Sequence, residues 1–133
     1  MTLQEREARA CDIIDSMAEE LRDVSLYLHH NPELGLNEHK AVKVINQFLE
    51  THNFTSQVGL TDLPELQTAL RGDYNDTAQH KIAFLGEYDA LPELGHGCGH
   101  NLIAMMSLGA AIAFSKSAPE AWGTTFFGCP AEE

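Results

Sequence analysis

Positive charge is scarce in this sequence. Lysine and arginine together number 8, against 20 aspartate and glutamate residues, so the formal net charge is −12. Because affinity for nucleic acids comes largely from basic side chains that replace counterions at the phosphates, nucleic acid is not expected as a partner. The acidity can attract metal cations and basic ligands, although a solubilising surface is the simpler interpretation.

Long apolar runs are also missing. No stretch approaches the roughly 20 apolar residues that span a bilayer, and the segment from Met1 to Glu7 is too charged for a signal peptide. We therefore expect a soluble, cytoplasmic protein without a membrane partner. The three cysteines, Cys11, Cys98 and Cys129, are odd in number and widely spaced. They do not resemble a disulfide framework, so reduced thiols are expected.

Apolar spacing in the first half of the chain predicts helices. The 133 residues, 44% of them hydrophobic, have the size and composition of one globular domain. From Leu3 to Leu28 apolar residues recur mostly at spacings of three and four, which is typical of an amphipathic helix. A second helix is predicted from an N-cap at Asn37 to about His52. The pattern then weakens, with one strand predicted around Leu66 to Arg71 and a polar loop from Gly72 to His80.

The second half of the chain reads as a strand, a helix and a strand. Lys81 to Leu85 and Gly123 to Gly128 are short apolar or β-branched runs, and Leu102 to Phe114 has the length of a buried helix. In such a βαβ unit the two strands run parallel, so the loops that follow them open on the same edge of the sheet. We therefore expect the loop from Glu87 to His100 to meet the Glu132-Glu133 pair.

These two segments carry side chains that bind metals. The run from Gly86 to Asn101 holds three carboxylates, two histidines and a thiol. Cys98 and His100 offer a thiolate and an imidazole, and Glu133 could add a carboxylate. Glycines at alternate positions in this run let the backbone bend tightly around an ion. In a pair such as Glu132-Glu133, one carboxylate can bind the metal while its neighbour accepts a proton.

Other chemistries fit the same residues. Cys98 could be a nucleophile with His96 or His100 as its base, and this thiol hydrolase ranks second on residue chemistry alone. The glycine-rich loop lacks both the dinucleotide spacing and the Walker lysine, so it is not expected to cradle a phosphate. In isolation, adjacent glutamates are most often a solvated pair.

Four segments resemble, in the right order, the N-terminal motifs of the aminoacylase and amidohydrolase metallopeptidases, peptidase family M twenty. They are Leu28 to Gly35, Gly86 to Pro92, His96 to Asn101 and Pro130 to Glu133. The form Glu-Tyr-Asp-Ala-Leu-Pro is most similar to the animal aminoacylase-like dipeptidases, which include an enzyme acting on β-alanyl-lysine. The resemblance covers essentially the whole chain.

The resemblance implies a fold, a reaction and a set of site residues. The fold is a three-layer α/β/α zinc-peptidase-like catalytic domain with a mostly parallel sheet. The enzyme is a dinuclear hydrolase, using Zn, Mn or Co, that cleaves an amide in a small dipeptide or N-acyl amino acid. By position, Cys98, His100 and Glu133 match metal ligands, Glu132 matches the general base, and Asp89 matches a carboxylate that orients a ligand.

Length sets this chain apart from the family. Its members continue well beyond the glutamate pair, with further histidine ligands, the rest of the sheet and a lid or dimerisation domain. We therefore expect residues 1–133 to be the truncated N-terminal portion of a catalytic domain, with at most part of the metal site. A sheet cut at this point exposes an apolar edge and face, which favours a homo-oligomer. The alternative to a dipeptidase is a catalytically inactive fragment that assembles or binds.

Overall fold

Three helices precede the first strand in the computed structural model, which describes residues 1–60 and 62–133. The helices are α1 (Leu3–Ser16), α2 (Ala18–His30), α3 (His39–Thr51) and α4 (His100–Ser117), and the strands are β1 (Thr55–Val58), β2 (Leu70–Tyr74), β3 (His80–Glu87) and β4 (Trp122–Cys129). A short 3-10 helix, His96–Cys98, leads into α4. The predicted helix and strands of the second half are thus confirmed.

The helices of the first half depart from the prediction at their ends. The long amphipathic helix is divided in two at Met17, which lies outside helical geometry at φ −101° and ψ 0° and is buried in the core. Helix α3 begins after Glu38 rather than after Asn37. Both breaks depend on which side chains the core accepts, and helical spacing alone does not report this.

The four strands form one mixed sheet in the order β1-β2-β4-β3. Strands β3 and β4 are parallel, as predicted, and their ends are aligned, with Glu87 opposite Cys129. The other two pairings are antiparallel, so the expectation of a mostly parallel sheet is corrected. Parallel neighbours need a crossover connection, whereas the short loop between β2 and β3 reverses the direction of the chain. Strand β1 was not predicted, and β2 starts near the end of the predicted Leu66 to Arg71 strand.

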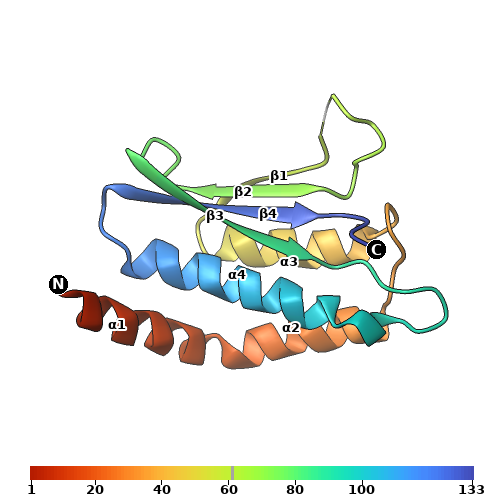
Figure 1. Ribbon diagram of the computed structural model, residues 1–133, viewed down its shortest axis with the longest axis horizontal. Coiled ribbons are helices and arrows are strands. Elements are labelled where there is room, and N and C mark those ends of the chain that lie inside the picture. The colour runs from red at the N-terminus through yellow and green to blue at the C-terminus, as the bar shows by residue number, and fades with distance from the viewer. Residues whose placement is uncertain (61) are drawn as a thin grey trace.

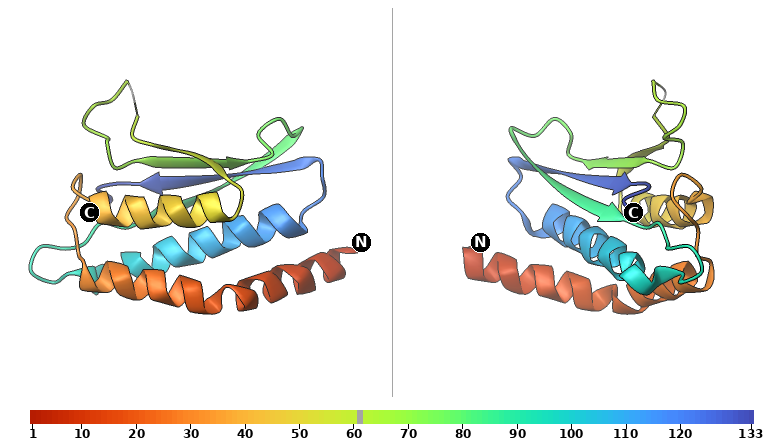
Figure 2. Two further views of the ribbon diagram at one scale, coloured as in Figure 1. Left: turned by 180° about the vertical axis from the view of Figure 1, so that it is seen from behind. Right: turned by 45° about the vertical axis from the view of Figure 1, so that its right-hand side comes forward.

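The helices lie in two layers on one face of the sheet (Figures 1 and 2). Helix α3 packs on β1 and β2, α4 packs on β3 and β4, and α1 and α2 pack against α4. The predicted α/β class is confirmed, but a helix layer on the opposite face is not found among the described residues. The sheet contains one βαβ crossover, and α4 is its helix, so this connection covers only one face. None of the helices in residues 1–60 and 62–133 has the length and apolarity needed to cross a membrane.

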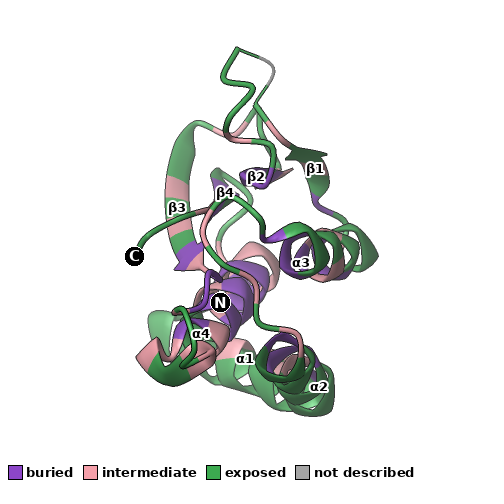
Figure 3. Cartoon of the chain, turned by 90° about the vertical axis from the view of Figure 1, so that its right-hand side faces the viewer, coloured by how far each residue is buried: buried purple, intermediate pink, exposed green. Residues whose placement is uncertain are grey.

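The core fills the space between the sheet and the helices (Figure 3). Its largest fully buried apolar side chains come from α2, α3, α4 and β4: Leu28, Ile45, Leu49, Leu108, Ile112 and Phe126. On the opposite face of the sheet, Leu85 is 55% exposed and Phe127 is 36% exposed. The guanidinium of Arg71 lies over the Phe127 ring, 5.8 Å from its centre. One face of the sheet is therefore dry and the other is partly apolar and open.

Replacement of Leu108 by alanine is expected to destabilise the protein by about 3 kcal/mol, because it removes a fully buried side chain of α4 and leaves a cavity. Urea unfolding monitored by circular dichroism measures this change. The matched control is Leu102→Ala in the same helix, where the side chain is 59% exposed and the expected change is within about 0.5 kcal/mol. Equal effects of the two variants would contradict the packing of α4 described above.

Candidate metal centre

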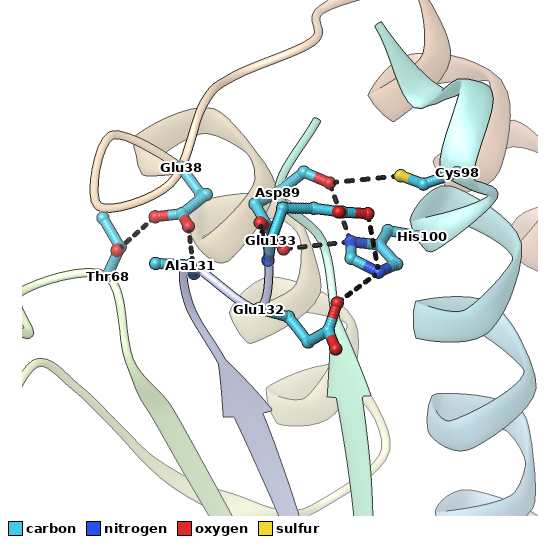
Figure 4. Close-up of polar contacts among 8 residues, drawn as sticks. All are labelled: Glu38, Thr68, Asp89, Cys98, His100, Ala131, Glu132 and Glu133. Atoms are coloured by element: carbon cyan, nitrogen blue, oxygen red, sulfur yellow. Dashed lines mark hydrogen bonds and ion pairs between the residues drawn. The ribbon is translucent and has the colours of Figure 1, made fainter. Parts of the chain in front are cut away.

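The loops that follow β3 and β4 meet at one edge of the sheet (Figure 4). Asp89 follows β3, His100 begins α4, and the Glu132-Glu133 pair follows β4. Since β3 and β4 are parallel with aligned ends, both loops leave the sheet at the same edge. The expected meeting of the two segments is found.

Three potential metal donors converge here. The ligand atoms of Cys98, His100 and Glu133 all lie within 4.8 Å of one another. Ligands of a tetrahedral zinc ion, bound at 2.0–2.3 Å, would be about 3.3–3.8 Å apart. Cys98 is half-buried, His100 is buried and Glu133 is exposed, so the two side chains nearer the solvent can close this gap by rotation. The donor types and their spacing fit a divalent ion.

Asp89 determines how the His100 ring is presented. The Nδ1 atom of His100 is 2.9 Å from the Asp89 carbonyl oxygen and 3.0 Å from its Oδ1. Two acceptors at this nitrogen favour the tautomer with hydrogen on Nδ1, which leaves the Nε2 lone pair free. A carboxylate that holds the distal nitrogen of a ligand histidine is a common support for metal sites. The position of Asp89 therefore matches the orienting role implied by the family resemblance.

The exposed side of the ring faces the two glutamates. The Nε2 atom of His100 is 3.2 Å from Glu132 Oε2 and 3.7 Å from Glu133 Oε1. Burial opposes the charged imidazolium, yet the hydrogen bonds and charge of Asp89, together with the charge of Glu132, raise the pKa of His100. Two carboxylates directed at one nitrogen create a negative site that a cation can occupy in place of the proton.

Asp89 also holds the strand end that carries the glutamates. Its Oδ2 accepts a hydrogen bond of 3.0 Å from the Glu133 backbone N–H, and its side chain is only 1% exposed. One buried carboxylate thus contacts both halves of the site. The close approach of α4 depends on Gly99, which precedes the helix with φ +87°, a left-handed conformation that glycine adopts without strain.

The thiol of Cys98 has surroundings unlike those of a nucleophile paired with a base. Its Sγ lies 3.9 Å from the carbonyl oxygen of Asp89, the only hydrogen-bond partner recorded for it in the described residues. Both nitrogens of His100 face carboxylate or carbonyl oxygens. The other candidate base, His96, has a buried Nδ1 with no partner in the described part of the chain, and burial, followed by the charge of His100, lowers its pKa.

Two polar residues at the site were missed in the sequence. Glu38 and Thr68 are fully buried and joined by a hydrogen bond, and Glu38 also contacts the segment that precedes the glutamate pair. Glu38 stands in a polar stretch before α3 and Thr68 stands in a weakly patterned one. No spacing in the sequence marks either residue as buried.

Similar proteins place this geometry in context. No family model matches the chain. The chain is 36% identical over 136 residues to the Xaa-Arg dipeptidase of Mus musculus, an alignment that covers 94% of the chain and 32% of that protein. It is 31% identical to a polypeptide of the p-aminobenzoyl-glutamate hydrolase of Escherichia coli, with 92% of the chain and 29% of that polypeptide covered. The chain thus spans about a third of the length of these relatives.

Solved structures show the same fold. A Bacillus subtilis protein described as a dinuclear metal-binding peptidase of the M20 family superposes with a TM-score of 0.74 at 24% identity, over 89% of this chain and 36% of that one. A putative aminohydrolase from methicillin-resistant Staphylococcus aureus superposes with a TM-score of 0.77 at 19% identity, over 95% of this chain and 35% of that one. As its four motifs predicted, the chain belongs, as the N-terminal part of a longer fold, to this family of metallopeptidases.

Proposed function

We propose that residues 1–133 form the N-terminal portion of the catalytic domain of a metal-dependent amidohydrolase or dipeptidase. The observation that carries this proposal is the convergence of the Cys98, His100 and Glu133 donors beside the free carboxylate of Glu132. The names of the hydrolases to which the chain is similar support the same reaction class.

In this proposal Cys98, His100 and Glu133 hold a divalent cation. Thiolate, imidazole and carboxylate together suit zinc, and manganese or cobalt acceptably. A bound cation supplies Lewis acidity, which polarises the substrate carbonyl and favours ionisation of water. The related peptidase described as dinuclear supports two ions in a full-length form, for which the described residues provide one donor set.

Glu132 is the proposed general base. Its carboxylate reaches His100 Nε2 while remaining about half exposed, so it lies beside the donor set and can still contact water. It accepts a proton from the attacking water and passes it to the leaving amine. Asp89 keeps His100 in the tautomer that binds metal and holds the backbone of Glu133.

The proposed substrate is a small dipeptide or N-acyl amino acid, with dipeptides that carry a basic residue, such as β-alanyl-lysine, as a specific candidate. Two observations support a basic substrate. The chain has a net charge of −12, which favours the approach of cations. Two of the relatives are named Xaa-Arg dipeptidase.

Replacement of Asp89 by asparagine is expected to weaken metal binding by about 10–100-fold, the usual effect of losing a partner that supports a ligand histidine. The single amide oxygen of asparagine cannot serve both His100 Nδ1 and the Glu133 N–H. Competition with a chromophoric chelator measures the affinity for Zn²⁺ and Co²⁺. The control is Asp12→Asn on the exposed surface of α1, which changes the net charge equally. Unchanged affinity in the Asp89 variant would reject its proposed role.

The two neighbouring glutamates are expected to respond differently to the same substitution. Glu132→Gln should lower kcat by about 10²–10⁴-fold, the usual contribution of a general base, and leave the bound metal in place. Glu133→Gln should reduce metal affinity, because it removes a ligand. Metal content by atomic emission and turnover of an Xaa-Arg dipeptide, both on the 133-residue protein, measure the two effects. Turnover that survives complete metal removal would instead support the thiol hydrolase chemistry of Cys98.

A second candidate is a catalytically inactive fragment that assembles with another copy of itself. Strand β3 is an edge strand of eight residues, and Leu85 on it is 55% exposed. An open edge with exposed apolar side chains favours pairing between chains. Bound metal without turnover of any dipeptide or N-acyl amino acid would favour this candidate.

If the sheet mediates assembly, Leu85→Lys is expected to convert the assembled protein to monomer, because a charge on an edge strand opposes pairing. Sedimentation velocity measures the change in mass. The matched control is Leu3→Lys on α1, where leucine is 74% exposed and lies away from the sheet. A wild-type protein that is already monomeric would exclude self-assembly.

A further inference from the structure

Glu38 is a fully buried acid to which the proposed chemistry gives no role. Its exposed fraction is 0%, and it is the N-cap residue of α3, yet its side chain makes no capping hydrogen bond. The first turn of α3 is capped instead by Glu33, whose carboxylate accepts from the N–H groups of Lys40 and Ala41 at 2.9–3.0 Å. The Glu38 side chain is thereby free to turn into the protein.

The Glu38 carboxylate joins two segments that are distant in sequence. One oxygen accepts a hydrogen bond of 2.5 Å from the Thr68 hydroxyl. The other accepts one of 2.8 Å from the backbone N–H of Ala131, the residue immediately before Glu132 (Figure 4). A buried carboxyl is tolerated when such donors satisfy it, so both bonds are needed in the folded state.

Ala131 has an unusual backbone conformation. Its φ is +53°, in the left-handed region that disfavours residues with a Cβ atom. A Cβ atom on Gly35 would lie 2.9 Å from the Ala131 Cβ, so the loop before α3 packs directly against this turn. The conformation that directs Glu132 and Glu133 towards His100 is thus held from the side by the Gly35 to Glu38 loop.

The same contacts lead to the other half of the site. The Thr68 carbonyl oxygen accepts a hydrogen bond from the Tyr88 hydroxyl, and Tyr88 precedes Asp89. The Glu33 carbonyl oxygen accepts from the N–H of Ala90 at 2.8 Å, on the other side of Asp89. Residues 33–38 therefore contact the backbone beside Asp89 as well as the backbone beside Glu132.

From these contacts we infer that Glu38 is a positioning residue, which fixes the turn at Ala131 and so places the Glu132-Glu133 pair against His100. The inference rests on the proposed function, because it concerns the arrangement of the same donors. Glutamine is the informative replacement. It has the shape of glutamate, but its single amide oxygen cannot accept from both Thr68 and Ala131.

The test compares Glu38→Gln, Thr68→Val and the wild-type 133-residue protein by two measurements. The first is affinity for Zn²⁺ and Co²⁺, with the Co²⁺ absorption spectrum reporting the donor set. Glu38→Gln should lose about tenfold or more in affinity, as substitution of groups that support metal ligands usually does. Thr68→Val keeps an oxygen for Ala131 and should lose less. Ser117→Ala, which removes a buried hydrogen bond at the far end of α4, controls for a general loss of stability.

The second measurement is hydrogen exchange of the Ala131 amide, which needs no metal. Exchange at Ala131 should be slow in the wild type and at least tenfold faster in Glu38→Gln, while Ser117→Ala leaves it unchanged. Rapid exchange at Ala131 in the wild type would overturn the inference even if the Glu38 variant does not fold. Wild-type metal affinity in a folded Glu38→Gln protein would overturn it as well.

These outcomes separate the inference from the proposed function. If the wild type binds no metal, the proposed ligand set fails, and Ala131 exchange still decides whether Glu38 holds the turn. If the wild type binds metal and only the Glu38 prediction fails, the ligand set stands and Glu38 has no positioning role.

Discussion

The buried carboxylate of Asp89 is the contact on which the arrangement of the site depends. One of its oxygens holds His100 Nδ1 and the other holds the backbone of Glu133. These groups belong to the start of α4 and to the end of β4, and neither element contains Asp89 itself. Since the side chain is almost inaccessible to water, its hydrogen bonds are strong and leaving a partner unmatched is costly. The same interaction sets the ring tautomer and the separation of the two loops.

Behind this contact lies a second tier of buried polar groups. The Tyr88 ring passes over Gly128 of β4, where a Cβ atom would lie 2.8 Å from the ring, and its hydroxyl reaches the Thr68 carbonyl oxygen. Burial and the neighbouring charges of Glu38 and Asp89 raise the pKa of Tyr88, so the hydroxyl stays protonated and donates. Glu38 completes the set by accepting from Thr68 and Ala131. The early motif around Pro32 and Glu33 thus supports the site without facing it.

The similarity to longer hydrolases agrees with the open parts of the molecule. The chain spans about a third of the relatives' length. Strand β3 is at an edge of the sheet, the face that carries Leu85 and Phe127 is partly apolar, and the metal donors lie beside this edge. Exposed apolar surface next to a polar site is typical of a surface that another segment or molecule covers.

Several features could be predicted from the sequence because they depend on local pattern. Short apolar runs predicted β3 and β4, and the helical run between them predicted α4. From that order, the rule for parallel strands placed Cys98, His100 and Glu133 together. Asp89 was assigned to an orienting role through the resemblance of its motif.

Other features depend on contacts between distant segments. The direction of β1 and β2, and so the mixed sheet, follows from pairing that spacing does not encode. Glu38 looks like an ordinary acid before a helix, and its burial becomes visible only when Thr68 and Ala131 are brought to it. The sequence by itself determined which side chains are available for metal chemistry and on which edge they gather. Only the tertiary structure decided how they are held, because buried hydrogen bonds form between residues up to 93 positions apart.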